Sequence, residues 1–260
     1  MPTLLSTLQA DVLTLTLNRP ERANSFNVEL ISELQEAFSQ AEKDSQVRVI
    51  ILTGSGKAFS AGQDISEMQG GGVISYRTHL KKTYNPLVIK IRRIEKPVLA
   101  AINGPCAGAA LGIALACDLR LATEEAKLAV GFGGIGLVPD SAVSLLLPVL
   151  IGLGRAEQLY FNNAPVYARQ ALEWGLLNRI FPAAKFMDDT LAYAKELASG
   201  PIRAFGLAKQ AFNRAVLSNL EDVLNTEADL QEIAGNRPEH KEGVAAFWEK
   251  RKPKYKNDIR

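Results

Sequence analysis

The chain has 260 residues, a formal net charge of +2, 47% hydrophobic residues and 22% charged residues. This length suits one large core or one domain with a small extension, and the composition excludes a largely disordered protein. The small net charge argues against a protein that coats nucleic acid.

The first 180 residues alternate expected strands with expected helices. Runs of apolar and β-branched residues predict strands at 12–17, 47–53, 97–102, 118–122 and 127–130. Apolar residues at helical spacing predict helices from the cap Asn27 through Phe38, and over 81–93, 108–116, 141–147, 155–161 and 168–174. The run at 47–53 is apolar throughout, which is typical of a strand buried on both faces. Residues 66–79 are polar and rich in glycine, and they predict a mobile loop or lid.

From residue 187 to 248 the pattern is almost entirely helical, so we expect an α/β core with a helical extension. The two most apolar runs, 107–117 and 142–154, are shorter than the ~18 residues that a membrane span needs. The N-terminal residues show no basic leader, and Cys106 and Cys117 lie in apolar sequence typical of buried free thiols. We therefore expect a cytoplasmic protein without disulfides.

Two glycine-rich stretches suggest nucleotide-binding loops at first sight. Residues 54–57 read Gly-Ser-Gly-Lys, but a phosphate loop needs a glycine where Ile51 stands and Ser or Thr where Ala58 stands. Residues 131–136 satisfy the pattern G-x-G-x-x-G, but Pro139 interrupts the helix that should follow. We expect the second stretch to be a turn that lines some other ligand.

Two further turns place small residues where the chain leaves an expected strand. Residues 59–65, Phe-Ser-Ala-Gly-Gln-Asp-Ile, follow one strand, and residues 103–110, Asn-Gly-Pro-Cys-Ala-Gly-Ala-Ala, follow another and open a helix. Small residues let backbone N–H groups approach a ligand closely, and a helix start adds a partial positive charge. Each turn alone fits a plain strand-to-helix connection, but two such donors meeting at one carbonyl oxygen would form an oxyanion hole.

With these turns the sequence resembles the crotonase (enoyl-CoA hydratase/isomerase) superfamily over essentially its whole length. The motifs that carry the resemblance, in the family's order and spacing, are Leu17-Asn18-Arg19-Pro20 with Asn24, Ala-Gly-Gln-Asp at 61–64, Lys96-Pro97, Asn103-Gly104, Cys117-Asp118 and Phe-Trp-Glu-Lys-Arg at 247–251. The resemblance implies an α/β fold with a crotonase-like spiral of ββα repeats over residues 1–195. It also implies a C-terminal helical region over 196–260 that builds a homotrimer or a hexamer.

The resemblance implies two binding sites as well. The backbone N–H groups of Gln63 and Ala109 would form an oxyanion hole for an acyl-coenzyme A thioester. The positions that would contact coenzyme A, the last two from a neighbouring subunit, are Arg22, Ala23, Ala61, Asp64, Ile65, Phe247 and Lys250. Coenzyme A would arrive with the substrate, and no permanently bound cofactor, metal, nucleic acid or membrane partner is implied.

The hydratase branch of the family uses two glutamates, and this sequence has neither of them. The aligned positions hold Gly112 and Phe132, whose side chains cannot move a proton. Adding water to a double bond needs one group to activate the water and another to deliver a proton. We therefore expect no efficient hydration by the arrangement that hydratases use.

One acid, Asp140, lies in a mostly apolar stretch directly after Pro139. It could cap a following helix, or it could be an acid-base group whose pKa is raised by apolar surroundings. The motifs Ala-Gly-Gln-Asp-Ile at 61–65, Tyr-Asn-Pro-Leu-Val at 84–88 and Gly-Leu-Val-Pro-Asp-Ser at 136–141 resemble one isomerase branch, that of bacterial phenylacetate degradation. That branch converts ring-1,2-epoxyphenylacetyl-CoA into oxepin-CoA and moves a 3,4 double bond into conjugation with the thioester. Ala142 and Val143 stand where the branch has a glycine.

The sequence thus predicts an acyl-CoA isomerase in which Asp140 carries a proton from one carbon to another. Two alternatives stay open: an enoyl-CoA hydratase of fatty-acid β-oxidation with a displaced carboxylate such as Glu67, and a non-catalytic protein of the same fold that binds coenzyme A or RNA. The near-neutral charge argues against RNA. His79 is expected to lie exposed in the 66–79 loop rather than to take part in catalysis.

Overall fold

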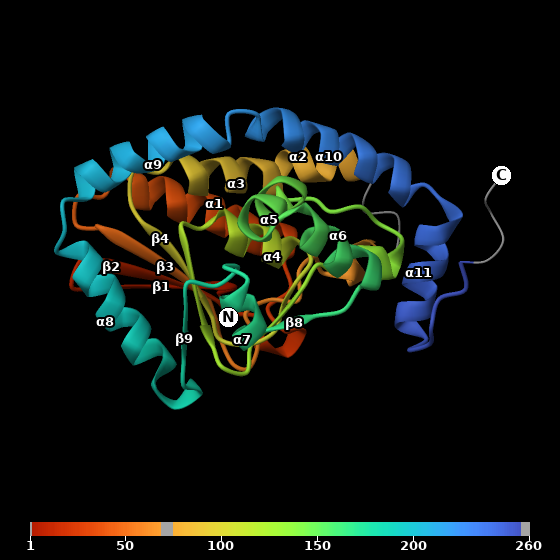
Figure 1. Ribbon diagram of the computed structural model, residues 1–260, viewed down its shortest axis with the longest axis horizontal. Helices are drawn as coiled ribbons and strands as arrows, with labels where there is room; N and C mark the ends of the chain where they lie inside the picture. The colour runs from red at the N-terminus through yellow and green to blue at the C-terminus, as the bar shows by residue number, and fades with distance from the viewer. Residues whose placement is uncertain (1, 69–74, 256–260) are drawn as a thin grey trace.

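Two β-sheets and the helices packed on them make up the fold in the computed structural model, which describes residues 2–68 and 75–255 (Figure 1). The larger sheet contains β1 (Leu4–Gln9), β2 (Val12–Leu17), β3 (Val49–Gly54), β4 (Val98–Ile102), β6 (Leu119–Thr123) and β9 (Arg179–Phe181), neighbours in that order. Within the described part of this sheet, β1 and β2 are antiparallel and the other neighbouring pairs are parallel. The smaller sheet contains β5 (Cys106–Ala107), β7 (Lys127–Ala129) and β8 (Val166–Tyr167).

The central strands of the larger sheet are buried on both faces, as the apolar run at 47–53 predicted. In β3, Ile50 and Leu52 face one core cluster, whereas Val49 and Ile51 face another, because successive side chains of a strand point to opposite sides. Helix α8 (Phe186–Ala198) covers the second face. Helices α1 (Val28–Lys43), α3 (Tyr84–Arg93) and α4 (Ala109–Ala116) cover the first, as Figure 1 shows.

The expected cap of the first helix is confirmed: the Asn27 side chain accepts a hydrogen bond of 2.9 Å from the Leu30 N–H group. The loop expected at 66–79 is only partly correct. Residues 65–68 form a short 3-10 helix, α2 covers Tyr76–Lys82, and residues 69–74 lie outside the described part of the chain. The single helix expected at 81–93 is also wrong, because the backbone breaks at Thr83 between α2 and α3.

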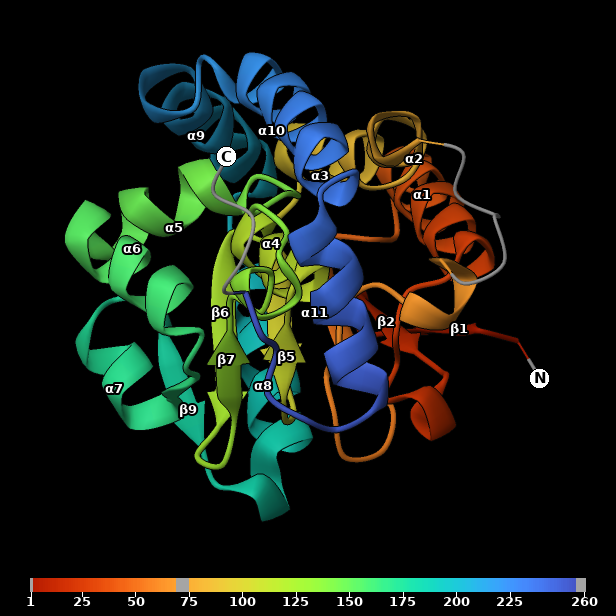
Figure 2. The same cartoon turned by 90° about the vertical axis from the view of Figure 1, so that its right-hand side faces the viewer.

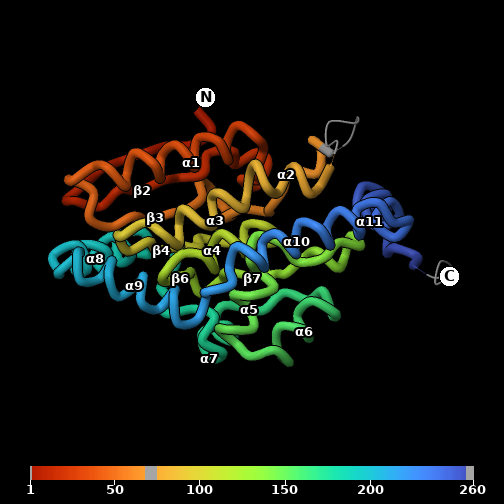
Figure 3. Tube along the Cα trace, turned by 90° about the horizontal axis from the view of Figure 1, so that it is seen from above, coloured from red at the N-terminus to blue at the C-terminus, as the bar shows by residue number. Residues whose placement is uncertain are grey.

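The rest of the chain is mostly helical, as the sequence predicted. The remaining helices are α5 (Val143–Ile151), α6 (Leu153–Asn162), α7 (Ala168–Glu173), α9 (Ile202–Val216), α10 (Leu220–Gly235) and α11 (Pro238–Trp248). Helix α10 packs on α2, α3 and α5, and α11 packs on the 3-10 helix at 133–135. Figure 3 shows α11 at one end of the molecule beyond α10, and Figure 2 looks onto that end with α11 in front.

Both cysteines are buried and free, as expected. Among residues 2–68 and 75–255, no helix combines the length and apolar character needed to cross a bilayer. The division of the chain at residue 195 stays a prediction.

Candidate active site

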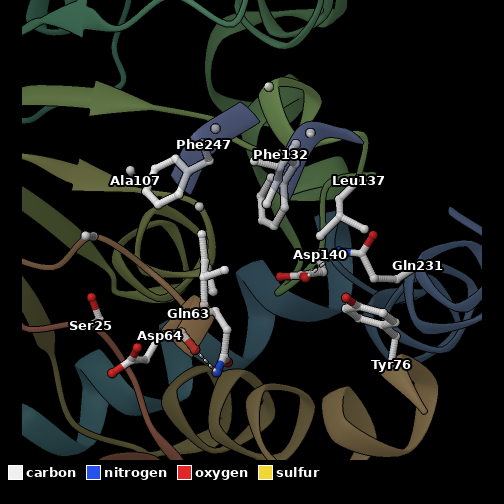
Figure 4. A pocket seen from close by; sticks show the side chains of 18 of the residues that line it. Ser25, Gln63, Asp64, Tyr76, Ala107, Phe132, Leu137, Asp140, Gln231 and Phe247 are labelled. Carbon is white, nitrogen blue, oxygen red and sulfur yellow. Dashed lines mark hydrogen bonds between the residues drawn. The ribbon is translucent and has the colours of Figure 1, made fainter. Parts of the chain in front are cut away.

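A cavity of about 600 Å³ lies where the two small-residue turns leave the sheets, between α2, α3 and α11 (Figure 4). Its wall includes Gln63 from the first turn and Ala109 from the second. Asp140 also lines it, and Figure 4 shows the carboxyl of Asp140 pointing into the space beside Phe132. The three residues that the sequence proposed for catalysis therefore share one cavity.

The two turns are held side by side by backbone contacts. Ser60 forms a parallel bridge with Cys106, and the Ser60 carbonyl accepts a hydrogen bond of 3.1 Å from the Ala107 N–H group. Gly62 has a φ of +88°, and a β-carbon there would lie 3.3 Å from the Ala109 nitrogen. A glycine at position 62 therefore allows the two turns to approach this closely.

Two backbone N–H groups at this contact are left available. Their neighbours are used: the Gly62 N–H donates to Ser60 Oγ, and the Gly108 N–H donates to the Ala129 carbonyl. The N–H groups of Gln63 and Ala109 have no hydrogen-bond acceptor among the described residues. Ala109 is also the first residue of α4, where N–H groups have no partner within the helix. This pair has the arrangement required to hold a carbonyl oxygen that gains negative charge.

The side chain of Gln63 is fixed by two residues that the sequence did not single out together. Its Oε1 accepts a hydrogen bond from the Tyr84 hydroxyl and lies 3.0 Å from His79 Nε2. His79 belongs to α2 and lines the cavity, so the expectation of an exposed loop histidine is wrong. Burial lowers the pKa of His79, which favours the neutral ring. Contacts of this kind, between a turn and two helices further along the chain, carry no local sequence signal.

Asp140 is buried, with 6% of its surface exposed. Burial raises its pKa to about 6, while hydrogen bonds from Ser141 Oγ (2.8 Å) and Gln231 Nε2 (2.8 Å) act in the opposite direction. It does not cap a helix through its side chain, because α5 begins at Val143. A carboxyl with a pKa near neutrality is suited to take up and return a proton.

The turn that carries Asp140 is strained. Ser141 and Ala142 both have positive φ values, 57° and 65°, which cost non-glycine residues about 1–2 kcal/mol each. Glu227 of α10 holds the turn, since its carboxylate accepts from the N–H groups of Ala142 (2.8 Å) and Ser144 (3.0 Å). Burial raises the pKa of Glu227 to about 7. Strain of this kind is commonly kept at functional sites.

The two positions that align with the hydratase glutamates are occupied by other groups. A β-carbon on Gly112 would lie 2.6 Å from both the Cβ and the carbonyl oxygen of Ser141. Phe132 is largely buried and lines the cavity. The turn that carries Asp140 therefore fills the place of the first glutamate, and an aromatic ring stands at the second.

Five of the seven positions expected to contact coenzyme A line the cavity: Arg22, Ala61, Asp64, Ile65 and Phe247. Ala23 and Lys250 are not in its wall. The Ala23 carbonyl instead accepts a hydrogen bond from the Ala61 N–H (3.0 Å), and Lys250 is exposed just beyond α11.

Asp64 is occupied by contacts within the protein. Burial acts to raise its pKa, but hydrogen bonds from Ser66 and Arg19 outweigh it, and the pKa lies below the usual value. Its carboxylate therefore shapes the turn after Gln63 rather than standing free for a ligand.

The last helix forms a wall of the cavity in its own chain. Phe247, Trp248 and Arg251 line it, and Figure 4 shows Phe247 across the cavity from Gln63. His240 anchors α11: its Nδ1 lies 2.7 Å from the Ile135 carbonyl and its Nε2 lies 2.6 Å from the Tyr76 hydroxyl. Within the described residues, no group of three or more His, Cys, Asp or Glu side chains is arranged to hold a metal ion.

Comparison with known proteins adds three findings. A family model described as enoyl-CoA hydratase/isomerase matches residues 7–258. The chain is 38% identical over 258 residues to a 1,2-epoxyphenylacetyl-CoA isomerase of Escherichia coli K12, and the match covers 98% of both chains. It is also 35% identical over 244 residues to 4-chlorobenzoyl coenzyme A dehalogenase-2 of an Arthrobacter species, and this match covers 92% of the present chain and 88% of the dehalogenase. A crystal structure of an enoyl-CoA hydratase from Mycobacterium avium subsp. paratuberculosis K-10 matches with a TM-score of 0.89 at 35% identity, covering 98% and 99% of the two chains.

Proposed function

The chain belongs to the enoyl-CoA hydratase/isomerase family, and from that premise we propose that it is an acyl-CoA isomerase with Asp140 as its acid-base group. The observation that carries the proposal is a buried carboxyl in the same cavity as two backbone N–H groups that have no acceptor among the described residues. Its substrates are a ring-1,2-epoxyphenylacetyl-CoA, a 3-enoyl-CoA, or both.

In the proposed reaction the thioester carbonyl oxygen accepts hydrogen bonds from the N–H groups of Gln63 and Ala109. Asp140 removes a proton from the α-carbon, and the negative charge spreads onto the held oxygen. The same carboxyl then returns the proton to the γ-carbon, which moves the double bond into conjugation. One oxyanion donor is typically worth about 2.7–4 kcal/mol, so two such donors supply much of the stabilisation. One carboxyl is sufficient because no water is consumed.

The aryl substrate is supported by the lining of the cavity that contains Asp140. Phe132 and Leu137 lie near this carboxyl, and Leu80 and Tyr84 add further apolar and aromatic surface to the same cavity wall, which suits a ring. With the ring epoxide, Asp140 assists opening by proton transfer. The similarity to the Escherichia coli isomerase supports the same assignment.

The rival hydratase reaction is disfavoured by the position of Ser141, which fills the space next to Gly112. Glu67, the displaced carboxylate that could replace the missing pair, is not in the wall of the cavity. Its pKa is raised by burial and by the charge of Asp64, but no described contact brings it to Asp140. Water addition by the two-glutamate arrangement of hydratases therefore has neither of its carboxyls at the described cavity wall.

The coenzyme A part of the substrate is proposed to lie toward Arg22 and α11. The Arg22 side chain is exposed at the rim of the cavity, where a cation suits phosphate groups. Coenzyme A arrives with the substrate, so the proposed reaction uses no permanently bound cofactor. We place the protein in the cytoplasm, where acyl-CoA thioesters are handled.

We also propose a homotrimer, or a hexamer built from two trimers. Three large side chains of α9, Leu207, Phe212 and Val216, are exposed to 62%, 70% and 52% in the single chain. Apolar surface of this kind is typical of a face that a second copy covers. Light scattering after gel filtration gives the mass directly, and a monomer would contradict this proposal.

The proposed function is tested by offering the protein a ring-epoxide CoA, a 3-enoyl-CoA and crotonyl-CoA, and identifying the products by mass spectrometry. We expect isomerisation of one or both of the first two substrates and little hydration of the third. The variant Asp140→Asn should lower turnover by about 10²–10⁴-fold while acyl-CoA binding is nearly retained, because only the base is removed. Unchanged turnover in this variant would refute the assignment.

A further inference from the structure

We propose that Gln231 is a positioning residue for the reaction, which fixes the orientation of the Asp140 carboxyl and favours its ionised form. This inference rests on the proposed role of Asp140. Gln231 lies on α10, about ninety residues further along the chain, and it lines the same cavity.

The orientation of the Gln231 amide is set by a second contact. Its Oε1 accepts a hydrogen bond of 3.0 Å from the Val138 N–H group, so its Nε2 faces Asp140 Oδ2 at 2.8 Å. Reversing the amide would place an oxygen against a carboxylate and an NH₂ group against a backbone N–H. Because Gln231 is 1% exposed, water does not compete for these contacts.

Gln231 is the partner that ties Asp140 to the scaffold. The other donor, Ser141 Oγ, comes from the next residue of the same turn and moves with it. Each oxygen of Asp140 thus accepts one hydrogen bond, and an ionised carboxylate has further lone pairs available for a substrate proton. The proton must be taken from one carbon and returned to another, so a carboxyl free to rotate would lose the geometry at both.

The surroundings of Asp140 make these two neutral donors important. Glu227, one turn earlier on α10, brings a second buried carboxyl near Asp140, and Tyr84 approaches from α3. Tyr76 and His79 line the cavity from α2, and α4 presents only apolar residues and Gly112. No cation among the described residues forms an ion pair with Asp140. The negative charge of Asp140 therefore depends on Gln231 and Ser141.

The test replaces Gln231 by leucine, which keeps the approximate size and removes the donor. The matched control is Asn225→Leu on the exposed side of the same helix. Two measurements are made: the pH profile of kcat/KM with a 3-enoyl-CoA, and the infrared titration of the Asp140 carboxyl, isolated by subtracting the Asp140→Asn counterpart of each variant. In Gln231→Leu we expect the Asp140 titration to move upward by about one pH unit and kcat to fall about tenfold, with KM little changed. Asn225→Leu should match the parent protein in both.

An unmoved Asp140 titration in a folded Gln231→Leu protein would overturn the inference. If Gln231→Leu does not fold, Gln231→Met, which keeps the length and flexibility of the side chain, carries the same two measurements. The infrared titration needs no turnover, so the two proposals fail separately. Full activity of Asp140→Asn would refute the proposed function. The shift of the Asp140 titration in Gln231→Leu would still test whether Gln231 stabilises the ionised carboxyl.

Discussion

Gly112 and Ser141 are in direct contact, and a β-carbon at position 112 would lie 2.6 Å from the Cβ of Ser141. By the family resemblance, position 112 is where hydratases carry a glutamate. The turn of Ser141 holds Asp140 in place, so this turn and a side chain at 112 cannot occupy the same space. The chain therefore has room for one carboxyl arrangement or the other.

Gly112→Ala should destabilise the protein by about 1–3 kcal/mol, because the added methyl group meets backbone and side-chain atoms that cannot easily move. Urea unfolding measures the change. The control is Gly154→Ala in α6, where nothing lies within 4 Å of the added carbon, and which should be neutral or slightly stabilising. Equal effects at the two positions would contradict the tight contact.

The activity should decline at low pH because Asp140 must be ionised to accept a proton. Burial raises the pKa of Asp140 to about 6. Below that value kcat/KM should fall about tenfold per pH unit, and above it the profile should level off. Initial rates with a 3-enoyl-CoA between pH 4.5 and 8 give the profile. A rate independent of pH down to 4.5 is the result that this assignment cannot accommodate.

Asp140→Asn should make the protein more stable at pH 8 although it removes activity. The pKa of Asp140 is about 6 in the fold against the usual 3.8, so the folded state binds the proton more tightly than the unfolded state. As pH rises from about 4 to about 6, this group therefore reduces stability by about 1.4 kcal/mol per unit. Thermal unfolding from pH 4 to 8 should show the variant's advantage growing over this window. A constant difference between the two proteins would argue against a buried charge.

Gly62→Ala should impair catalysis by disturbing the oxyanion donors. The new β-carbon would lie 2.7 Å from the Ala107 carbonyl oxygen and 3.3 Å from the Ala109 nitrogen, at a φ of +88°. Loss of one donor typically costs 10²–10³ in kcat, and we expect a fall of about that size. Gly175→Ala shares the positive φ (+79°) but meets only the Leu150 carbonyl at 3.7 Å, so it controls for backbone strain. Steady-state kinetics of the two folded variants should separate these effects.

The longer strands and most helices of the core could be predicted from the sequence because the hydrophobic period reports which faces are buried, whereas the short strands β5, β8 and β9 were not expected. Val49 to Leu52 show this most clearly, since a run without polar residues requires a core on both sides of the strand. The loop expected at 66–79 was partly wrong because polar residues do not exclude a helix. Tyr76 and Leu80 pack on the core from α2, and this tertiary contact outweighs local composition.

The candidate site was foreseen in part. Gln63, Ala109 and Asp140 came from turns and a family resemblance, and the structure places all three at one cavity. Glu227 and Gln231 were missed because each acts on residues about 85–91 positions away in the sequence. Both are polar residues at buried positions of α10. Their role can be inferred only when the segment that packs against this helix is known.

The two-sided burial of the larger sheet has a practical consequence for protein engineering. The α8 side has its own core cluster, which includes Phe186, Ala194 and Leu121, whereas the cavity residues Ala109, Phe132 and Leu137 belong to the cluster on the opposite side. Substitutions that do not share a partner tend to add independently. The α8 layer can therefore be redesigned for heat tolerance while the substrate chamber is varied in a separate library, and the best members of each can be combined.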